Sequence, residues 1–505
     1  MIEPYRAADH HTISSFTSAC RTVFMWLCAG LLIGLYSSPL SANNGLSSTP
    51  LPDLGIQEAV QIDPPTEKAL GQQWLRALRG NAPIEEDPLV NDYVEHLVYS
   101  LVPHSELDSS ELELVVVDNP QINAFAVPGG IVGINTGLIL SAAYEDEVAS
   151  VIAHELAHLS QKHFLRRVSS MKKAQTVNIA GILGAVALAL AGAPADASVA
   201  AVAASRAAAI DSILRHSRAH EQEADRIGMA TLLRSNRNPH AMPKFFQTLH
   251  EKYRFSSRPP EFLLTHPITE SRISDAKNRL RNVPNREYAH SVWFRLIRAR
   301  LQAQNSRDPA ALAAHLEEQF KMAERPDDQM IVQYAAAMAW VESAQPERSI
   351  KLMRDLVEAY PSAIILQYSL AEALMKAEKP SEAQSLIGKA LKSNPNNLTL
   401  ALLSARIHLQ TKQFKEALAS LEPLTRTKTI NNPNVWQVLA EASGKTGDAV
   451  NAHRYNAERL FATGRYNAAI GQLQLALPLS DNPQIIAKIK TRMSVFKQAS
   501  IPVEL

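Results

Sequence analysis

The pattern of apolar and polar residues is clearest between residues 144 and 163. Val148, Val151, Ile152, Leu156 and Leu159 recur three or four positions apart, which places them on one face of an α-helix. Acidic residues open this stretch and basic residues close it, as the dipole of a helix favours. The pattern therefore predicts an amphipathic helix over residues 144–163.

Upstream, the pattern predicts two helices and then three short strands. The helices are expected at Pro65–Arg79 and Pro88–Leu101, because a proline is well tolerated in the first turn of a helix. The strands are expected at Glu111–Val117, Asn123–Val127 and Ile131–Asn135, with a turn at Pro128–Gly130 between the last two.

The C-terminal half is helical and repeats itself. Small residues recur in pairs 12 positions apart, at Ala337/Ser349, Ala371/Ala383, Ala405/Ala417, Ala440/Ala452 and Ala457/Ala469. The first three pairs step by 34 residues, as do Pro361 and Pro395, whereas the fourth steps by 35 after an irregular insertion. A 34-residue helix-turn-helix period is typical of tetratricopeptide repeats, which stack into a superhelix with a concave face for peptides or proteins. The alternative is an unrelated helical domain.

The N-terminus carries the pattern of an export signal. An apolar run of 14 residues from Val23 to Tyr36 is followed by small residues that suit cleavage after Ala42. The alternative is an uncleaved N-terminal anchor. Cys20 and Cys28, the two cysteines of the chain, precede the expected cut, so the mature protein would form neither a disulfide nor a thiolate metal site. We expect an exported protein located in the periplasm.

A second apolar stretch runs from Ile179 to Ala193. Its 15 residues are few for a membrane span, and Pro194 and Asp196 interrupt it. A buried or surface-seated helix pair is expected here, with peripheral membrane contact as the alternative.

Length and charge limit the remaining possibilities. A chain of 505 residues is too long for one compact core, and its net charge of +1 offers no basic surface to nucleic acid. We divide it into a signal peptide (1–42), a linker (43–62), a first domain (63–284) and a repeat domain (285–505).

The predicted helix at 144–163 also carries a metal-binding pattern. His154 and His158 are four residues apart and therefore project from stacked turns of one helix face. Their imidazoles can meet at one zinc ion, and Glu155 lies close enough to act on a metal-bound water. The alternative is a surface helix that carries two histidines by chance.

A catalytic zinc site needs a third protein ligand. Glu221 and Asp225 are four residues apart on a second predicted helix, so they face the same way. Glu221 can bind the metal, while Asp225 can accept the N–H of a metal-binding histidine. The alternative is a solvated charged face. The nearby His220 lacks a ligand spacing and is expected at the surface.

Three runs of sequence together carry a family resemblance. They are Asn123-Ala-Phe-Ala-Val-Pro-Gly-Gly130, His154-Glu-Leu-Ala-His158 and Glu221-Gln-Glu-Ala-Asp225. They resemble the zinc metallopeptidase family that includes the heat-shock protease HtpX and the CAAX prenyl protease. From about residue 60 to the C-terminus, the chain is most similar to the β-barrel assembly-enhancing proteases of that family.

The resemblance implies a fold and a set of roles. The fold would be mainly α, with a zincin-type α+β metallopeptidase domain of helices and a small sheet, followed by an all-α tetratricopeptide-repeat superhelix. His154, His158 and Glu221 would hold one zinc ion per chain, Glu155 would be the general base, and Asp225 the second active-site acid.

Only the resemblance identifies His266 as a candidate metal ligand. In the close relatives, a histidine in a Leu-Leu-Thr-His-Pro loop can occupy the open metal position, and residues 263–267 match that loop. By itself, a lone histidine before proline is usually a turn residue. A histidine bound there would displace the reactive water and close the site until it moves away.

The predicted function is that of an exported zinc endopeptidase. Its substrate would extend along Ile131–Asn135, with Gly129 and Gly130 permitting close approach of the backbone. The resemblance suggests misassembled outer-membrane β-barrel proteins or their assembly machinery as partners, and a chaperone-like role. The alternatives are a non-proteolytic repeat scaffold with a structural or latent zinc site, and a membrane-embedded protease that uses Ile179–Ala193.

Overall fold

The computed structural model describes residues 63–172, 217–257, 259–286, 288–427 and 432–503. The predicted signal peptide, the predicted linker and the apolar stretch Ile179–Ala193 lie outside these residues. In the described part of the chain, no helix combines the length and the apolar character that a membrane crossing requires.

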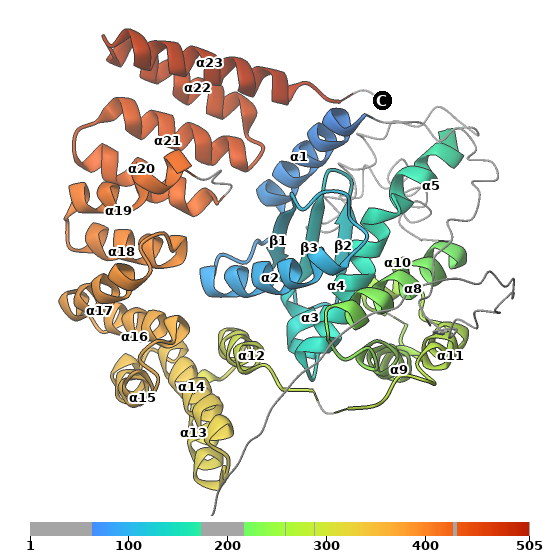
Figure 1. Cartoon of the computed structure of the whole chain (residues 1–505). Coiled ribbons are helices and arrows are strands. Elements are labelled where there is room, and N and C mark those ends of the chain that lie inside the picture. The colour runs from blue at the N-terminus through green and yellow to red at the C-terminus, as the bar shows by residue number, and fades with distance from the viewer. Residues whose placement is uncertain (1–62, 173–216, 258, 287, 428–431, 504–505) are drawn as a thin grey trace, which may run out of the picture. The chain divides into compact units, whose positions relative to one another are not determined.

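Three strands form the sheet of the N-terminal region, which comprises α1 to α11 (Figure 1). They are β1 (Glu113–Val117), β2 (Ala124–Val127) and β3 (Ile131–Asn135), close to the predicted bounds. The order is β1-β3-β2, with β3 parallel to β1 and antiparallel to β2. Strand β3 is therefore central, and β2 is an edge strand among the described residues.

This order corrects the expected path of the substrate. A peptide cannot pair with Ile131–Asn135, because both edges of that strand already pair with its neighbours. The two glycines also have a different role. Gly129 and Gly130 have positive φ angles of 87° and 79° in the turn between β2 and β3, and a Cβ on Gly129 would lie 2.8 Å from the carbonyl oxygen of Glu67 in α1. The glycines let this turn pack against α1.

Helices surround the sheet. They are α1 (Pro64–Asn81), α2 (Pro88–Leu101), α3 (Thr136–Ser141), α4 (Glu145–Ser160), α5 (His163–Lys172), α8 (Arg218–Arg234), α9 (Ala241–Tyr253), α10 (Glu261–Thr265) and α11 (Glu270–Arg279). The two predicted N-terminal helices are confirmed. The short α3 was not predicted, and the predicted helix over 144–163 ends three residues early. Lys162, with φ at 51°, breaks the helix, so His163 begins α5.

Helices α4 and α8 pack closely, and a glycine makes this contact possible. A Cβ on Gly228 of α8 would lie 3.0 Å from the backbone nitrogen of His154 and 3.1 Å from the carbonyl carbon of Ala153 in α4. A larger side chain at residue 228 would push these two backbones apart. The close contact brings the first turn of α8 next to the histidines of α4.

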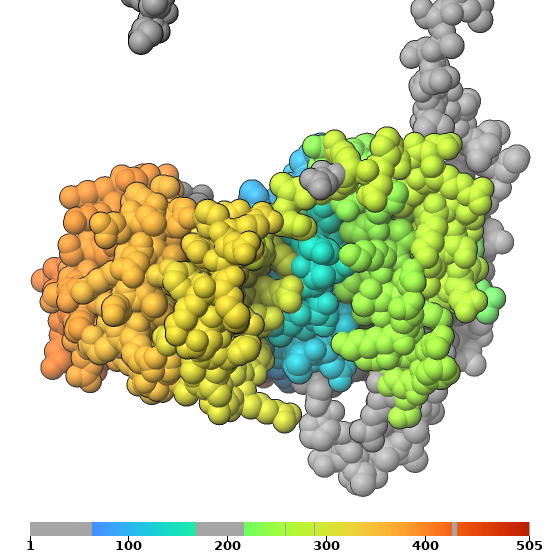
Figure 2. Space-filling view, turned by 90° about the horizontal axis from the view of Figure 1, so that it is seen from below, coloured from blue at the N-terminus to red at the C-terminus, as the bar shows by residue number. Residues whose placement is uncertain are grey.

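The repeat region, α12 to α23, is all-helical, as predicted. Its helices are α12 (Val292–Gln304), α13 (Pro309–Met322), α14 (Pro326–Glu342), α15 (Pro346–Ala359), α16 (Ile364–Lys376), α17 (Pro380–Ser393), α18 (Leu398–Gln410), α19 (Phe414–Thr427), α20 (Pro433–Lys445), α21 (Ala449–Ala462), α22 (Tyr466–Ala476) and α23 (Pro483–Ser500). Successive helices pack as antiparallel neighbours. In the space-filling view, repeat helices in yellow and orange lie beside the N-terminal region in cyan and green (Figure 2).

The paired small residues lie where neighbouring repeat helices touch. The first three pairs and the fifth are buried, which confirms their predicted role. Ala440 and Ala452, the pair that follows the irregular insertion, are only half-buried. The predicted boundary between residues 284 and 285 stays a prediction, because residues 57–505 form one compact unit.

A substitution at Gly228 tests the packing of α4 on α8. We expect Gly228→Val to lower the free energy of unfolding by about 1–3 kcal/mol, because the added methyl groups overpack a closed interface. Urea unfolding measures this change. The matched control is Gly388→Val in α17, where a Cβ would meet no atom within 4 Å. Equal stability of the two variants would contradict the close contact at Gly228.

Candidate metal centre

Two histidines on α4 form the base of a buried cluster. His154 and His158 are one helical turn apart, and their Nε2 atoms are 3.0 Å from each other. Their exposed fractions are 0% and 4%, because α4 packs against α2, α8, α9 and β2. Both imidazoles therefore point to one spot inside the protein.

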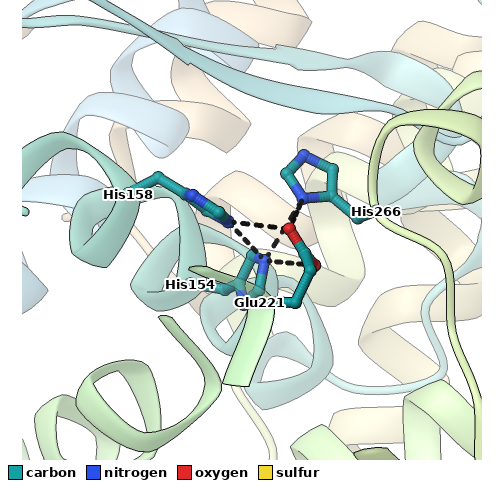
Figure 3. Close-up of side chains that lie close together, drawn as sticks. All are labelled: His154, His158, Glu221 and His266. Carbon is teal, nitrogen blue, oxygen red and sulfur yellow. Dashed lines mark hydrogen bonds and ion pairs between the residues drawn. The ribbon is translucent and has the colours of Figure 1, made fainter. Parts of the chain in front are cut away.

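Two further side chains converge on the same spot from other elements (Figure 3). Glu221, in the first turn of α8, lies with its carboxylate 3.5 Å from His154 Nε2 and 3.4 Å from His158 Nε2. His266 follows α10, and its Nδ1 is 3.1 Å from Glu221 Oε1 and 3.4 Å from His154 Nε2. One ligand atom from each of the four residues lies within 4.8 Å of the others.

Glu155 lies between this cluster and the edge strand. Its Oε1 is 3.5 Å from His266 Nε2, and the backbone N–H of Ala126 in β2 donates a hydrogen bond to its carboxylate. Burial raises the pKa of Glu155, because the interior disfavours its charged form. A carboxylate with a raised pKa is well suited to take up a proton near neutral pH.

Asp225 contacts His154, and Arg272 contacts both Asp225 and Glu221. Asp225 Oδ1 is 3.0 Å from His154 Nδ1, the nitrogen that faces away from the other ligand atoms. Arg272 of α11 donates to both oxygens of Asp225 at 2.7 Å. The same guanidinium lies 2.7 Å from Glu221 and donates to the carbonyl oxygen of Pro267 at 2.9 Å. Arg272 thus holds two carboxylates and the loop that carries His266.

The four convergent residues fit a metal ion. In a tetrahedral site with bonds of about 2.0–2.1 Å, neighbouring ligand atoms are roughly 3.3 Å apart. The direct contacts among His154, His158, Glu221 and His266 range from 3.0 to 3.5 Å, and one ligand atom from each lies within 4.8 Å of the others. Three imidazoles and one carboxylate are also a donor set that transition metals prefer.

The electrostatics of the cluster favour a cation at this position. Burial lowers the pKa of His154, but the carboxylates of Asp225 and Glu221 outweigh burial and raise this pKa to about 9. Glu155, Glu221 and Asp225 are three buried carboxylates at the site, and the guanidinium of Arg272 contacts two of them, Glu221 and Asp225. A divalent ion would neutralise the excess negative charge.

The structure brings all six sequence candidates together: His154, Glu155, His158, Glu221, Asp225 and His266. Sequence reasoning missed Arg272, because an arginine in a polar helix looks like any surface charge. It also missed the contact of His163 with His158. The spacing of five residues gives no signal of this contact, because the contact depends on the break between α4 and α5. His220, expected at the surface, is half-buried and stacks on His163 with ring centroids 4.3 Å apart.

Comparisons with known proteins agree with this arrangement. Residues 88–280 match the model of peptidase family M48, and residues 374–442 match a tetratricopeptide-repeat model. The beta-barrel assembly-enhancing protease of Escherichia coli (strain K12) is 32% identical over 431 residues, covering 85% of this chain and 87% of that protein. A Vibrio cholerae protein assigned to the same protease group is 35% identical over 423 residues, covering 83% and 86%. The mitochondrial metalloendopeptidase OMA1 of Saccharomyces cerevisiae is 31% identical over 182 residues, covering 34% and 48%.

Removal of the metal tests the balance of charge in the cluster. We expect a chelator to lower the Tm of the protein and added Zn²⁺ to restore it, because the ion offsets buried carboxylates. Ion at a thousandfold excess over its dissociation constant stabilises the folded state by about 4 kcal/mol. Differential scanning calorimetry measures the shift. A Glu221→Ala variant, which lacks the ligand carboxylate, should show little response to either treatment. If neither the chelator nor added Zn²⁺ changed the Tm of the parent protein, the result would argue against a metal site here.

Proposed function

The chain belongs to peptidase family M48, in the group of the β-barrel assembly-enhancing proteases, and on that premise we propose that it is an exported zinc endopeptidase. It acts in the periplasm on misassembled outer-membrane β-barrel proteins. The observation that carries the proposal is the buried cluster of two histidines and Glu221 with Glu155 beside it.

Each residue of the cluster has a role in peptide hydrolysis. His154, His158 and Glu221 hold the zinc ion, and Asp225 fixes the ring of His154. When bound, zinc polarises the scissile carbonyl and acidifies a water molecule. Glu155 takes the proton of that water and passes it to the departing amine. The raised pKa of Glu155 supports this role, because the carboxylate must hold a proton for part of the cycle.

The substrate adds to the sheet at β2 in this proposal. An extended peptide can pair with the free edge of an edge strand through backbone hydrogen bonds. Ala126 of β2 already reaches Glu155 with its backbone N–H, so a peptide along β2 passes close to the general base. A small hollow lined in part by Val127, Leu159 and Phe164 adjoins His158. We expect it to favour an apolar side chain next to the scissile bond.

The repeat region recruits proteins in this proposal. Tetratricopeptide repeats bind peptide or protein segments along their stacked helices, and the names of the relatives refer to β-barrel assembly. We therefore propose unfolded or misassembled outer-membrane proteins and the β-barrel assembly machinery as partners. Membrane contact through residues 179–193 stays a prediction.

His266 closes the site in this proposal. Its Nδ1 points at the same spot as the other three ligand atoms, and its Nε2 faces Glu155. A histidine in that position takes the place that the reactive water needs. Its loop is held by Arg272 through the carbonyl oxygen of Pro267, so release of this loop would open the site.

Replacement of the general base separates a protease from a scaffold. We expect Glu155→Gln to keep its zinc content but to lose about 10²–10⁴-fold in the rate of casein cleavage, because the amide cannot accept the proton. Zinc content by atomic absorption and cleavage by gel assay check this. The non-proteolytic scaffold gains support if the variant sustains outer-membrane protein assembly as well as the parent does.

Truncation of His266 tests the closed site. We expect His266→Ala to cleave casein or a misfolded outer-membrane protein faster than the parent, because a metal position becomes free for water. Initial rates at equal zinc content measure the effect. Leu264→Ala, a change at an exposed residue of α10, the short helix that precedes His266, is the control. No increase for His266→Ala relative to this control would contradict the proposal that His266 closes the site.

A further inference from the structure

The outward-facing nitrogen of His158 has a partner that the ligand motifs do not account for. His158 Nδ1 lies 2.8 Å from Nδ1 of His163, and both side chains are buried. On its other side, His163 Nε2 lies 3.0 Å from Oε2 of Glu223 in α8. A buried line of contacts thus runs from His158 through His163 to a carboxylate.

The fold builds this line from the break between two helices. Helix α4 ends at Ser160, and Lys162 adopts a positive φ of 51°, so the chain turns before α5 begins. The turn brings the ring of His163 back to His158, with the ring centroids 4.8 Å apart and the planes at 75°. In a continuous helix, two residues five positions apart would not face each other.

Neighbouring side chains hold the far end of the line. Arg166, one turn along α5, lies 3.3 Å from the same Glu223 oxygen that His163 contacts. His220 of α8 stacks on the His163 ring at an interplanar angle of 11°. Glu223 is 32% exposed at its side chain, whereas His163 is fully buried. Three contacts therefore fix the ring of His163: His220 stacks on its face, His158 contacts Nδ1 and Glu223 contacts Nε2.

The hydrogen-bond directions follow from the metal site. A neutral histidine that binds a metal through Nε2 carries its proton on Nδ1. His158 Nδ1 must then donate, so His163 Nδ1 accepts and the His163 proton sits on Nε2. That N–H donates to the Glu223 carboxylate. Zinc bound at His158 Nε2 therefore determines which nitrogen of each histidine, His158 and His163, carries the proton.

We propose that His163 and Glu223 are positioning residues for the metal ligand His158. This inference rests on the proposed function, because it takes His158 to be a zinc ligand. The pair fixes the ring orientation and the proton position of His158, just as Asp225 does for His154. Both histidines of the motif are then oriented by a carboxylate, directly for His154 and through a second imidazole for His158. Loss of such an outer partner typically costs 10–100-fold in metal affinity.

The experiment measures zinc affinity by chelator competition in the full-length mature protein. We expect His163→Leu to weaken zinc binding about 10–100-fold, because the leucine cannot accept the proton of His158. His163→Asn should recover a large part of the affinity, since its side-chain oxygen can accept near the position of Nδ1. We expect Glu223→Gln to fall between the parent and His163→Leu. The visible spectrum of the cobalt-substituted proteins should shift in the same order.

The matched control is His220→Leu, which removes the stacking on His163 but leaves the line of hydrogen bonds in place. It should bind zinc within about threefold of the parent. Equal losses for His220→Leu and His163→Leu, or a His163→Leu affinity within twofold of the parent, would overturn the inference. A parent that binds no zinc would instead refute the proposed function. Circular dichroism of each metal-free variant excludes a loss that comes from unfolding.

Discussion

The site depends on the balance between buried carboxylates and the cations that face them. Although burial raises the pKa of Glu221, the nearby His266 imidazole and the Arg272 guanidinium hold this pKa well below its usual range. The pKa of Glu155 is raised by the same burial. The pKa values of these two buried carboxylates are thereby shifted in opposite directions, which suits Glu221 to bind a cation and Glu155 to take up a proton. Arg272 contributes to this difference through its contact with Glu221 at 2.7 Å, and it also donates a hydrogen bond to the carbonyl oxygen of Pro267 in the loop that carries His266.

Close packing is what brings these charges within reach of one another. The histidines come from α4, the ligand carboxylate from α8, and the guanidinium from α11. The missing side chain of Gly228 lets α8 approach the backbone of α4 at residues 153 and 154. Because protein interiors are densely packed, a shift of α8 at this point would move Glu221 as well. The metal cluster is therefore a property of the helix interface as much as of its ligands.

The sequence predicted those features of the site that depend on local spacing. His154 and His158 face one spot because residues four apart on a helix do so, and Glu221 and Asp225 share a face for the same reason. Features that depend on tertiary contacts were missed or wrong. Periodicity identifies three strands but not their order, so β3 was chosen for a substrate although it is the central strand and β1 and β2 are the edges. The bond from His163 to His158 requires a helix break at Lys162, and neither residue alone signals it.

The repeat region also contributes to the placement of the site. Arg300 of α12 is buried and pairs with Asp87 and, at 2.6 Å, with Glu372 of α16. Asp87 in turn caps the N-terminus of α2 by accepting from the backbone N–H of Leu89. Breaking a buried pair by removing one partner costs about 3–5 kcal/mol, so this junction is not a loose linker. Helix α2 packs against α4, which carries both histidines. The ion pairs of Arg300 thus link α12 and α16 of the repeat region to α2, which in turn packs against the helix that carries the two histidines.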